Sequence, residues 1–135
     1  MKSKTITLFL VSFFALSSCE EALECAFGLD PEINENSVAP AQLDQEYFQI
    51  ITGEVDNDPN DNAYDYFFEI YGDLPPGIDV LFFARRIELV GRPQEVGTFN
   101  FRVYLYVESF DNGFFDASPT CSDEVSKNFS LVVTE

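Results

Sequence analysis

The chain has 135 residues, of which 46% are hydrophobic and 16% aromatic, and its formal net charge at pH 7 is −17. This length fits one domain of about 100 residues behind an N-terminal leader, and leaves no room for a second. The strong negative charge repels nucleic acid, so we expect no nucleic-acid partner. Histidine is absent, which removes the commonest general base and the commonest metal ligand near neutral pH.

The N-terminal segment has the zones of a secretory signal. Lys2 and Lys4 precede an apolar run over residues 6–16, which is too short to span a bilayer as a mature helix. Small residues then lead to Cys19. Loss of the two lysines with such a leader takes the net charge from −17 to −19.

The tetrapeptide Leu16-Ser17-Ser18-Cys19 resembles the lipobox of bacterial lipoproteins. This resemblance implies a cleaved signal peptide over 1–18, acylation of Cys19, a lipidated tether over 19–26 and a domain over 27–135. It also implies attachment to a membrane of the bacterial cell envelope, expected to be the outer membrane, on its periplasmic or its surface face. An ordinary signal peptide with a chance cysteine is the alternative.

Two further cysteines remain once Cys19 is assigned to lipidation. In an oxidising, extracytoplasmic compartment Cys25 and Cys121 can pair in only one intramolecular way. We therefore predict a disulfide, which closes a loop of nearly the whole domain and stabilises it by about 4 to 5 kcal/mol in the chain-entropy model. Two free thiols, with Cys25 flexible in the tether, are the alternative.

The mature chain reads as a series of short strands. The clearest alternation begins at Thr98, where every second residue is apolar, as in a half-buried strand. Another expected strand places Phe48 and Ile50 on one face, and the next carries aromatic residues on both faces, which favours a central position in its sheet. The expected strands are 25–29 at an edge, 46–52, 64–71 in the centre, 78–83, 86–90, 98–107 and 128–134.

The turns between these strands carry a series of motifs. They are Leu74-Pro75-Pro76-Gly77-Ile78, then Ile87-x-x-x-Gly91-x-Pro93, then Gly97-Thr98-Phe99-x-Phe101-x-Val103, then Phe129-Ser130-Leu131-Val132-Val133. The series, over residues 34–135, resembles the Ig-like and dystroglycan-type cadherin-like domains of bacterial surface proteins. It implies an all-β, immunoglobulin-like or cadherin-like sandwich of seven or eight strands with a binding or spacer role. Where such domains carry Thr-Gly before the isoleucine, this chain has Arg85-Arg86.

An acidic stretch over 53–63 separates two of the expected strands. Part of it, Asp58-Pro59-Asn60-Asp61-Asn62, resembles the DxNDN signature with which cadherins bind Ca²⁺. Closely spaced oxygen ligands are what Ca²⁺ requires, so Ca²⁺ is the candidate cofactor of this loop. An acidic turn without metal is the alternative, because Asp, Asn and Pro are ordinary turn residues. The candidate ligands are Asp56, Asp58, Asn60, Asp61 and Asn62.

The long connection over 108–127 is the second candidate site. Phe110, Phe114 and Phe115 surround an Asn-Gly pair, which is a hairpin signal. The stretch is therefore either a strand extension with its turn or an exposed aromatic surface that grips a sugar or a protein.

The sequence predicts a membrane-anchored Ig-like binding or adhesion module for a protein or glycan partner. It predicts no enzyme, because no Ser or Cys has a base to activate it and no acid pair stands out from the general acidity. A calcium-binding cadherin-like spacer and an accessory lipoprotein of an envelope complex are the alternatives.

Overall fold

The computed structural model describes residues 25–111, 113–122 and 124–135. Cys19, the leader and most of the tether lie outside these residues, so their roles stay predictions. Within the described part, no helix is long and apolar enough to cross a membrane. Residues 25–27 are helical, and the strands are β1 (Asp30–Ile33), β2 (Ala41–Gln42), β3 (Tyr47–Asp56), β4 (Tyr64–Gly72), β5 (Ile78–Phe82), β6 (Arg86–Gly91), β7 (Gly97–Asp111), β8 (Phe114–Asp116) and β9 (Glu124–Thr134).

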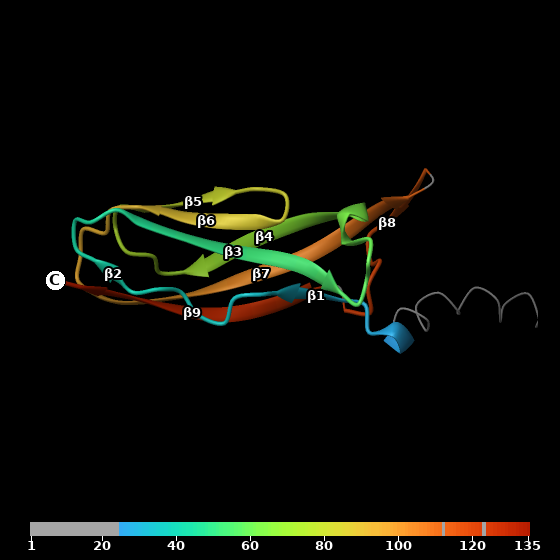
Figure 1. Ribbon diagram of the computed structural model, residues 1–135, viewed down its shortest axis with the longest axis horizontal. Helices are drawn as coiled ribbons and strands as arrows, with labels where there is room; N and C mark the ends of the chain where they lie inside the picture. The colour runs from blue at the N-terminus through green and yellow to red at the C-terminus, as the bar shows by residue number, and fades with distance from the viewer. Residues whose placement is uncertain (1–24, 112, 123) are drawn as a thin grey trace, which may run out of the picture.

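The strands form two sheets that lie along the long axis of the molecule (Figure 1). One sheet has the order β1-β3-β6-β5, and the other has the order β2-β9-β7-β4, with β8 paired to β7. Pairing is antiparallel except between β2 and β9. With β8 set aside as an insertion, β1-β3-β6-β5 correspond to strands A-B-E-D of an immunoglobulin domain, and β2-β9-β7-β4 correspond to A′-G-F-C. This is the immunoglobulin arrangement. The predicted all-β, immunoglobulin-like sandwich is confirmed.

The core lies between the two sheets. On β7 the alternation predicted from the sequence holds, because Phe101, Val103, Leu105 and Val107 are all at most 3% exposed. On β3 the face shared by Phe48 and Ile50 is the outer one, and Phe48 is 60% exposed. The facing residues of both sheets complete the core, namely Ile33, Tyr47, Ile51, Val55, Ile78, Ile87, Leu89, Phe129, Leu131 and Val133.

Two expected strand positions are wrong. The first strand is Asp30–Ile33 rather than 25–29, because β3 continues through Gly53 to Asp56 and offers its pairing positions to Asp30–Ile33. The strand β4 lies at the edge of its sheet, next to β7, rather than in the centre. Its aromatic residues lie on one face that packs into the core and on one face that is exposed.

The predicted turn motifs meet at one point of the fold. Gly77 and Gly91 have φ of +89° and +136°, and the amide of Arg92 donates a hydrogen bond of 3.0 Å to the Gly77 carbonyl. A Cβ on Gly91 would lie 2.1 Å from that same carbonyl oxygen. The two motifs thus require glycine where one backbone passes against the other.

The disulfide between Cys25 and Cys121 is present, as predicted, with a Cα–Cα distance of 4.6 Å and a sequence separation of 96. A backbone hydrogen bond of 2.8 Å from the Cys121 amide to the Leu29 carbonyl lies beside it. The first described residues are therefore fixed to the connection that precedes β9.

Candidate functional site

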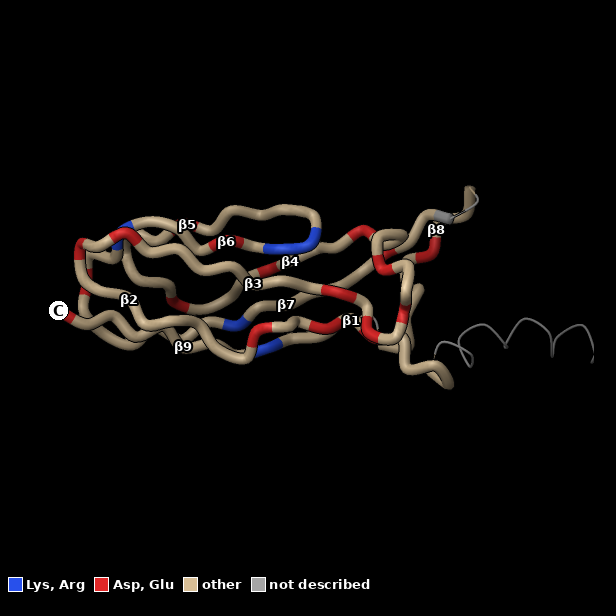
Figure 2. The backbone as a smooth tube through the Cα atoms, in the orientation of Figure 1, with Lys and Arg blue, Asp and Glu red and all other residues tan. Residues whose placement is uncertain are grey.

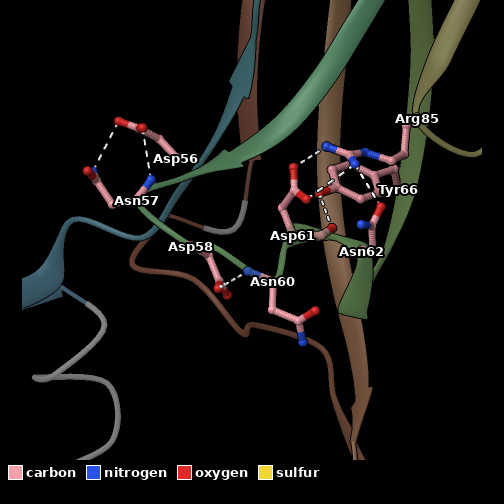
Figure 3. Close-up of polar contacts among 8 residues, drawn as sticks. All are labelled: Asp56, Asn57, Asp58, Asn60, Asp61, Asn62, Tyr66 and Arg85. Atoms are coloured by element: carbon pink, nitrogen blue, oxygen red, sulfur yellow. Dashed lines mark hydrogen bonds and ion pairs between the residues drawn. The ribbon is translucent and has the colours of Figure 1, made fainter.

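The acidic loop between β3 and β4 does not gather its oxygen atoms into one shell (Figure 3). Asp56 accepts hydrogen bonds from the amide and side chain of Asn57, and Asp58 accepts them from the Asn60 amide and the Tyr64 hydroxyl. Asp61 instead turns toward Arg85. Among the residues that the structure describes, no group of three or more acidic, Cys or His side chains could hold a metal ion. The three candidate carboxylates are thus near in sequence but are directed at different partners.

Arg85 occupies the place that a cation would take beside Asp61. Its guanidinium forms an ion pair with the Asp61 carboxylate, donates a 2.9 Å hydrogen bond to Asn62 Oδ1, and lies 5.1 Å from the centroid of the Tyr66 ring. The Tyr66 hydroxyl donates a 2.6 Å hydrogen bond to the Asp61 carbonyl. Burial raises the pKa of Tyr66, and the positive charge of Arg85 opposes that rise. The residue at which the chain departs from the Thr-Gly pattern therefore joins the β5–β6 turn to the acidic loop.

The second predicted site is a hairpin of β7 and β8, which confirms the hairpin interpretation of the connection. Phe110 lies directly opposite Phe115 in the register, and Phe114 lies on the other face of the ribbon. We call these three residues the aromatic hairpin. Phe110 is 66% exposed, Phe114 is 79% exposed and Phe115 is 61% exposed. Asn112 of the Asn-Gly pair lies outside the described residues, whereas Gly113 has φ of +83°.

A further aromatic surface covers the outside of the sheet that contains β4, β7 and β9. Cross-strand pairing places Phe67 opposite Tyr106, Glu69 opposite Tyr104, and Tyr71 opposite Arg102. The rings of Phe67 and Tyr106 stack with centroids 4.9 Å apart, and those of Tyr71 and Tyr104 meet edge to face at 5.5 Å. The Arg102 guanidinium lies 6.0 Å from the Tyr104 ring centroid. We call Phe67, Tyr71, Arg102, Tyr104 and Tyr106 the aromatic face.

A shallow depression adjoins this aromatic face. It has a volume of about 390 Å³, and its lining includes Tyr71, Asn100, Arg102 and Asn128. Arg102 Nε donates a 2.7 Å hydrogen bond to Asn128 Oδ1, which orients both side chains at its floor. The Tyr71 hydroxyl donates a 2.8 Å hydrogen bond to Glu69, and this bond to a carboxylate raises the pKa of Tyr71. The depression thus offers both donors and acceptors beside exposed aromatic rings.

Carboxylates border the aromatic face on three strands. Asp65 lies opposite Glu108, and Glu124 lies opposite Tyr106, all on the outer side of the sheet. Figure 2 shows how acidic positions outnumber basic ones along the whole molecule. The surface therefore combines an aromatic centre with a negative margin.

Sequence reasoning missed the aromatic face although its signal was present. Tyr104 and Tyr106 occupy the polar side of the alternation in β7, and β4 carries aromatic residues on both faces. From the sequence alone, aromatic residues on both faces of β4 favour a central strand and not an exposed surface. Each sheet of a two-layer sandwich has an outer face toward solvent, which leaves Phe67 and Tyr71 exposed by 38% and 58%.

Comparison with known proteins supports the fold and gives no closer relationship. No family model matches the chain, and no curated protein matches it. Among solved structures, it is similar to an endo-fucoidan hydrolase of glycoside hydrolase family 107, with a TM-score of 0.50, 13% identity, and coverage of 79% of this chain and 14% of the hydrolase. It is also similar to the titin M3 domain, with a TM-score of 0.48, 16% identity, and coverage of 79% and 99%.

The tandem Ig repeats of Dlar give a TM-score of 0.44 with 15% identity, over 79% of this chain and 50% of that one. At such identities the likeness concerns the fold alone, and the strand order itself carries the assignment. The fold is immunoglobulin-like.

Proposed function

We propose that this chain is a lipid-anchored, non-catalytic binding module of the bacterial cell envelope that docks a protein partner on its aromatic face. The anchor is Cys19, supported by the lipobox-like tetrapeptide. The observation that carries the binding role is the cluster of exposed Phe, Tyr and Arg side chains on the outer side of β4 and β7. Tyr and Arg are the residue types that most often dominate the energy of protein interfaces.

The geometry of the aromatic face favours a protein over a glycan. Phe67 and Tyr106 stack on one another, so the ring faces that touch are not free to stack on a sugar. The surface is a sheet face with only a shallow depression, which suits an extended interface. Its acidic margin, with a net charge of −17 over the whole chain, is complementary to a partner that surrounds an apolar patch with Lys and Arg.

Photo-crosslinking in cells tests this proposal. A photoreactive phenylalanine replaces Tyr71 in one strain and Phe48 in another, because these residues are similarly exposed, by 58% and 60%, on opposite sheets. We expect a discrete protein adduct from position 71 and none from position 48. The adduct should disappear when Tyr104→Ala and Arg102→Ala are added.

Adducts of equal intensity at both positions would mean that the aromatic face is not the docking surface. No protein adduct at position 71, together with glycan-array binding that the same two substitutions abolish, would replace the protein partner by a glycan. Hydrolytic activity that copurifies with the folded protein would contradict the non-catalytic role.

Membrane attachment has its own test. Cys19→Ala should leave the protein unacylated and release it from the membrane fraction, with an altered mobility on gels. Retention of the variant in that fraction at unchanged size would contradict lipidation at Cys19.

A further inference from the structure

We infer that the aromatic hairpin is the membrane-contacting end of the domain, with Phe110, Phe114 and Phe115 in the headgroup region of a zwitterionic bilayer. This inference rests on the proposed lipid anchor at Cys19. It assigns the second predicted site to lipid rather than to the protein partner, which the aromatic face is left to bind.

The disulfide decides which end of the domain is close to the anchor. Cys25 is bonded to Cys121, so the start of the domain cannot swing away from that end of the sandwich. The six-residue step from Cys19 to Cys25 reaches at most about 22 Å even when fully extended. The end of the sandwich that holds Cys25 therefore stays near the membrane surface.

The aromatic hairpin projects from this same end. In Figure 1 the β7–β8 ribbon extends beyond the sandwich at the side of residues 25–27, opposite the C-terminus. Phe27, also at this end, is 68% exposed. A projecting ribbon with aromatic side chains on both of its faces has little sandwich surface to bury them against.

The chemistry of this end selects the kind of lipid. Aromatic side chains favour the interface between headgroups and acyl chains over bulk water. Asp116 on β8, and Asp56 and Asp58 in the adjacent acidic loop, would be repelled by anionic lipids. A bilayer of zwitterionic phospholipid accepts the rings without that repulsion.

Single tryptophans test the contact, because the chain has no native Trp. Phe114→Trp and, as a matched control on the far end of β3, Phe48→Trp are made in the full-length acylated protein. Each variant is reconstituted in phosphatidylcholine vesicles that contain brominated lipids. We expect blue-shifted emission and strong quenching for Phe114→Trp, and emission unchanged from that in lipid-free detergent buffer for Phe48→Trp.

Three outcomes would overturn the inference, and they can be told apart. A protein that floats with the vesicles but shows no quenching of Phe114→Trp is anchored without hairpin contact, so the proposed anchor stands and the inference fails. Equal quenching of both variants means that the domain lies flat on the bilayer. A protein that does not float with the vesicles contradicts the anchor and the inference together. Quenching of Phe114→Trp should also weaken when half of the lipid is anionic.

Discussion

The contact between Arg85 and the acidic loop changes the interpretation of the calcium-like motif in that loop. The acidic loop resembles a calcium-binding signature, yet the carboxylate of Asp61 is already paired with a guanidinium from a turn 24 residues away. Calcium would have to displace Arg85, or bind without Asp61. The loop is therefore held to the sandwich by a residue of the chain itself.

The first prediction compares Arg85 with its neighbour. Arg85→Ala should lower the free energy of unfolding by about 1–2 kcal/mol, since it removes a charge-assisted hydrogen bond and a cation–π contact beside the partly buried Asp61. Arg86 also forms an ion pair, with Glu88, and lies 4.6 Å from the centroid of the Phe83 ring. Its side chain is nevertheless more exposed than that of Arg85, by 47% against 35%, so Arg86→Ala should cost about 0.5 kcal/mol or less. Urea unfolding of both variants measures the difference. Equal losses would show that Arg85 does not hold the loop.

The second prediction concerns the metal. Because the carboxylates of Asp56, Asp58 and Asp61 are directed at different partners, Ca²⁺ and Mg²⁺ at equal ionic strength should give superimposable melting curves. A more sensitive experiment records the same melting curves for Arg85→Ala, in which Asp61 is free to bind a cation. A rise in the melting temperature of the wild-type protein with Ca²⁺ alone would restore the calcium site and show that the loop rearranges.

The third prediction follows from Tyr47, which donates a 2.8 Å hydrogen bond to the Ala39 carbonyl. Burial raises the pKa of Tyr47 to about 12 from its ordinary value of 10. The folded state then holds this proton more tightly than the unfolded state, so the contribution is intact below pH 10 and is lost as the pH rises toward 12. The resulting loss in the free energy of unfolding is of the order of 2 kcal/mol.

Unfolding by urea from pH 8 to pH 12 measures that slope. Tyr47→Phe, which cannot ionise, should lose less stability over this range than the wild-type protein does. Parallel slopes for the two proteins would mean that Tyr47 ionises equally in the folded and unfolded states.

At the scale of elements, local pattern and long-range pairing differ in what they reveal. The alternation around Val103 and Leu105 predicts a strand and its buried face, because both depend on neighbours in sequence. The edge position of β4 and the extension of β3 to Asp56 depend on partners far along the chain, which no local pattern specifies. The same holds for the pairing of Arg85 with Asp61. The disulfide was predictable only because two cysteines remained once Cys19 was assigned to lipidation.

The fourth prediction tests the point where two turn motifs meet. Gly91→Ala should cost about 3 kcal/mol, because it combines a strained positive φ with a Cβ pressed against the Gly77 carbonyl. Gly113→Ala is the control, since φ there is also positive but no atom lies within 4 Å of the added Cβ. It should cost about 1 kcal/mol from backbone strain alone. Thermal unfolding of both variants separates contact from strain.

At the scale of the whole molecule, the aromatic face and the aromatic hairpin lie at different positions. The aromatic face runs along the side of the sandwich, and the aromatic hairpin lies at the end that holds Cys25. In the proposed orientation the partner approaches from the side while the hairpin faces lipid. The two surfaces can then be occupied at the same time.

The fifth prediction addresses the disulfide, which closes a loop spanning 96 residues. Replacing both cysteines, Cys25→Ser with Cys121→Ser, should lower the free energy of unfolding by about 2–4 kcal/mol, below the chain-entropy value of about 4–5 kcal/mol. Denaturation without reductant compares the double variant with the wild-type protein. A loss below about 0.5 kcal/mol would show that the bond restricts the folded state about as much as the unfolded state, and the chain-entropy argument would then fail for this loop.

The same bond sets how the domain responds to a mechanical pull. Tension from a membrane anchor would otherwise reach β1 first, a four-residue strand at a sheet edge that can peel away one hydrogen bond at a time. The disulfide diverts that tension to Cys121 and so toward β9, which is paired with β7 from Gly97 to Tyr106. Stretching then has to slide a long inner strand along its neighbours. In the proposed arrangement, a pull on a partner bound to the aromatic face would therefore load this paired inner strand and not the edge strand β1.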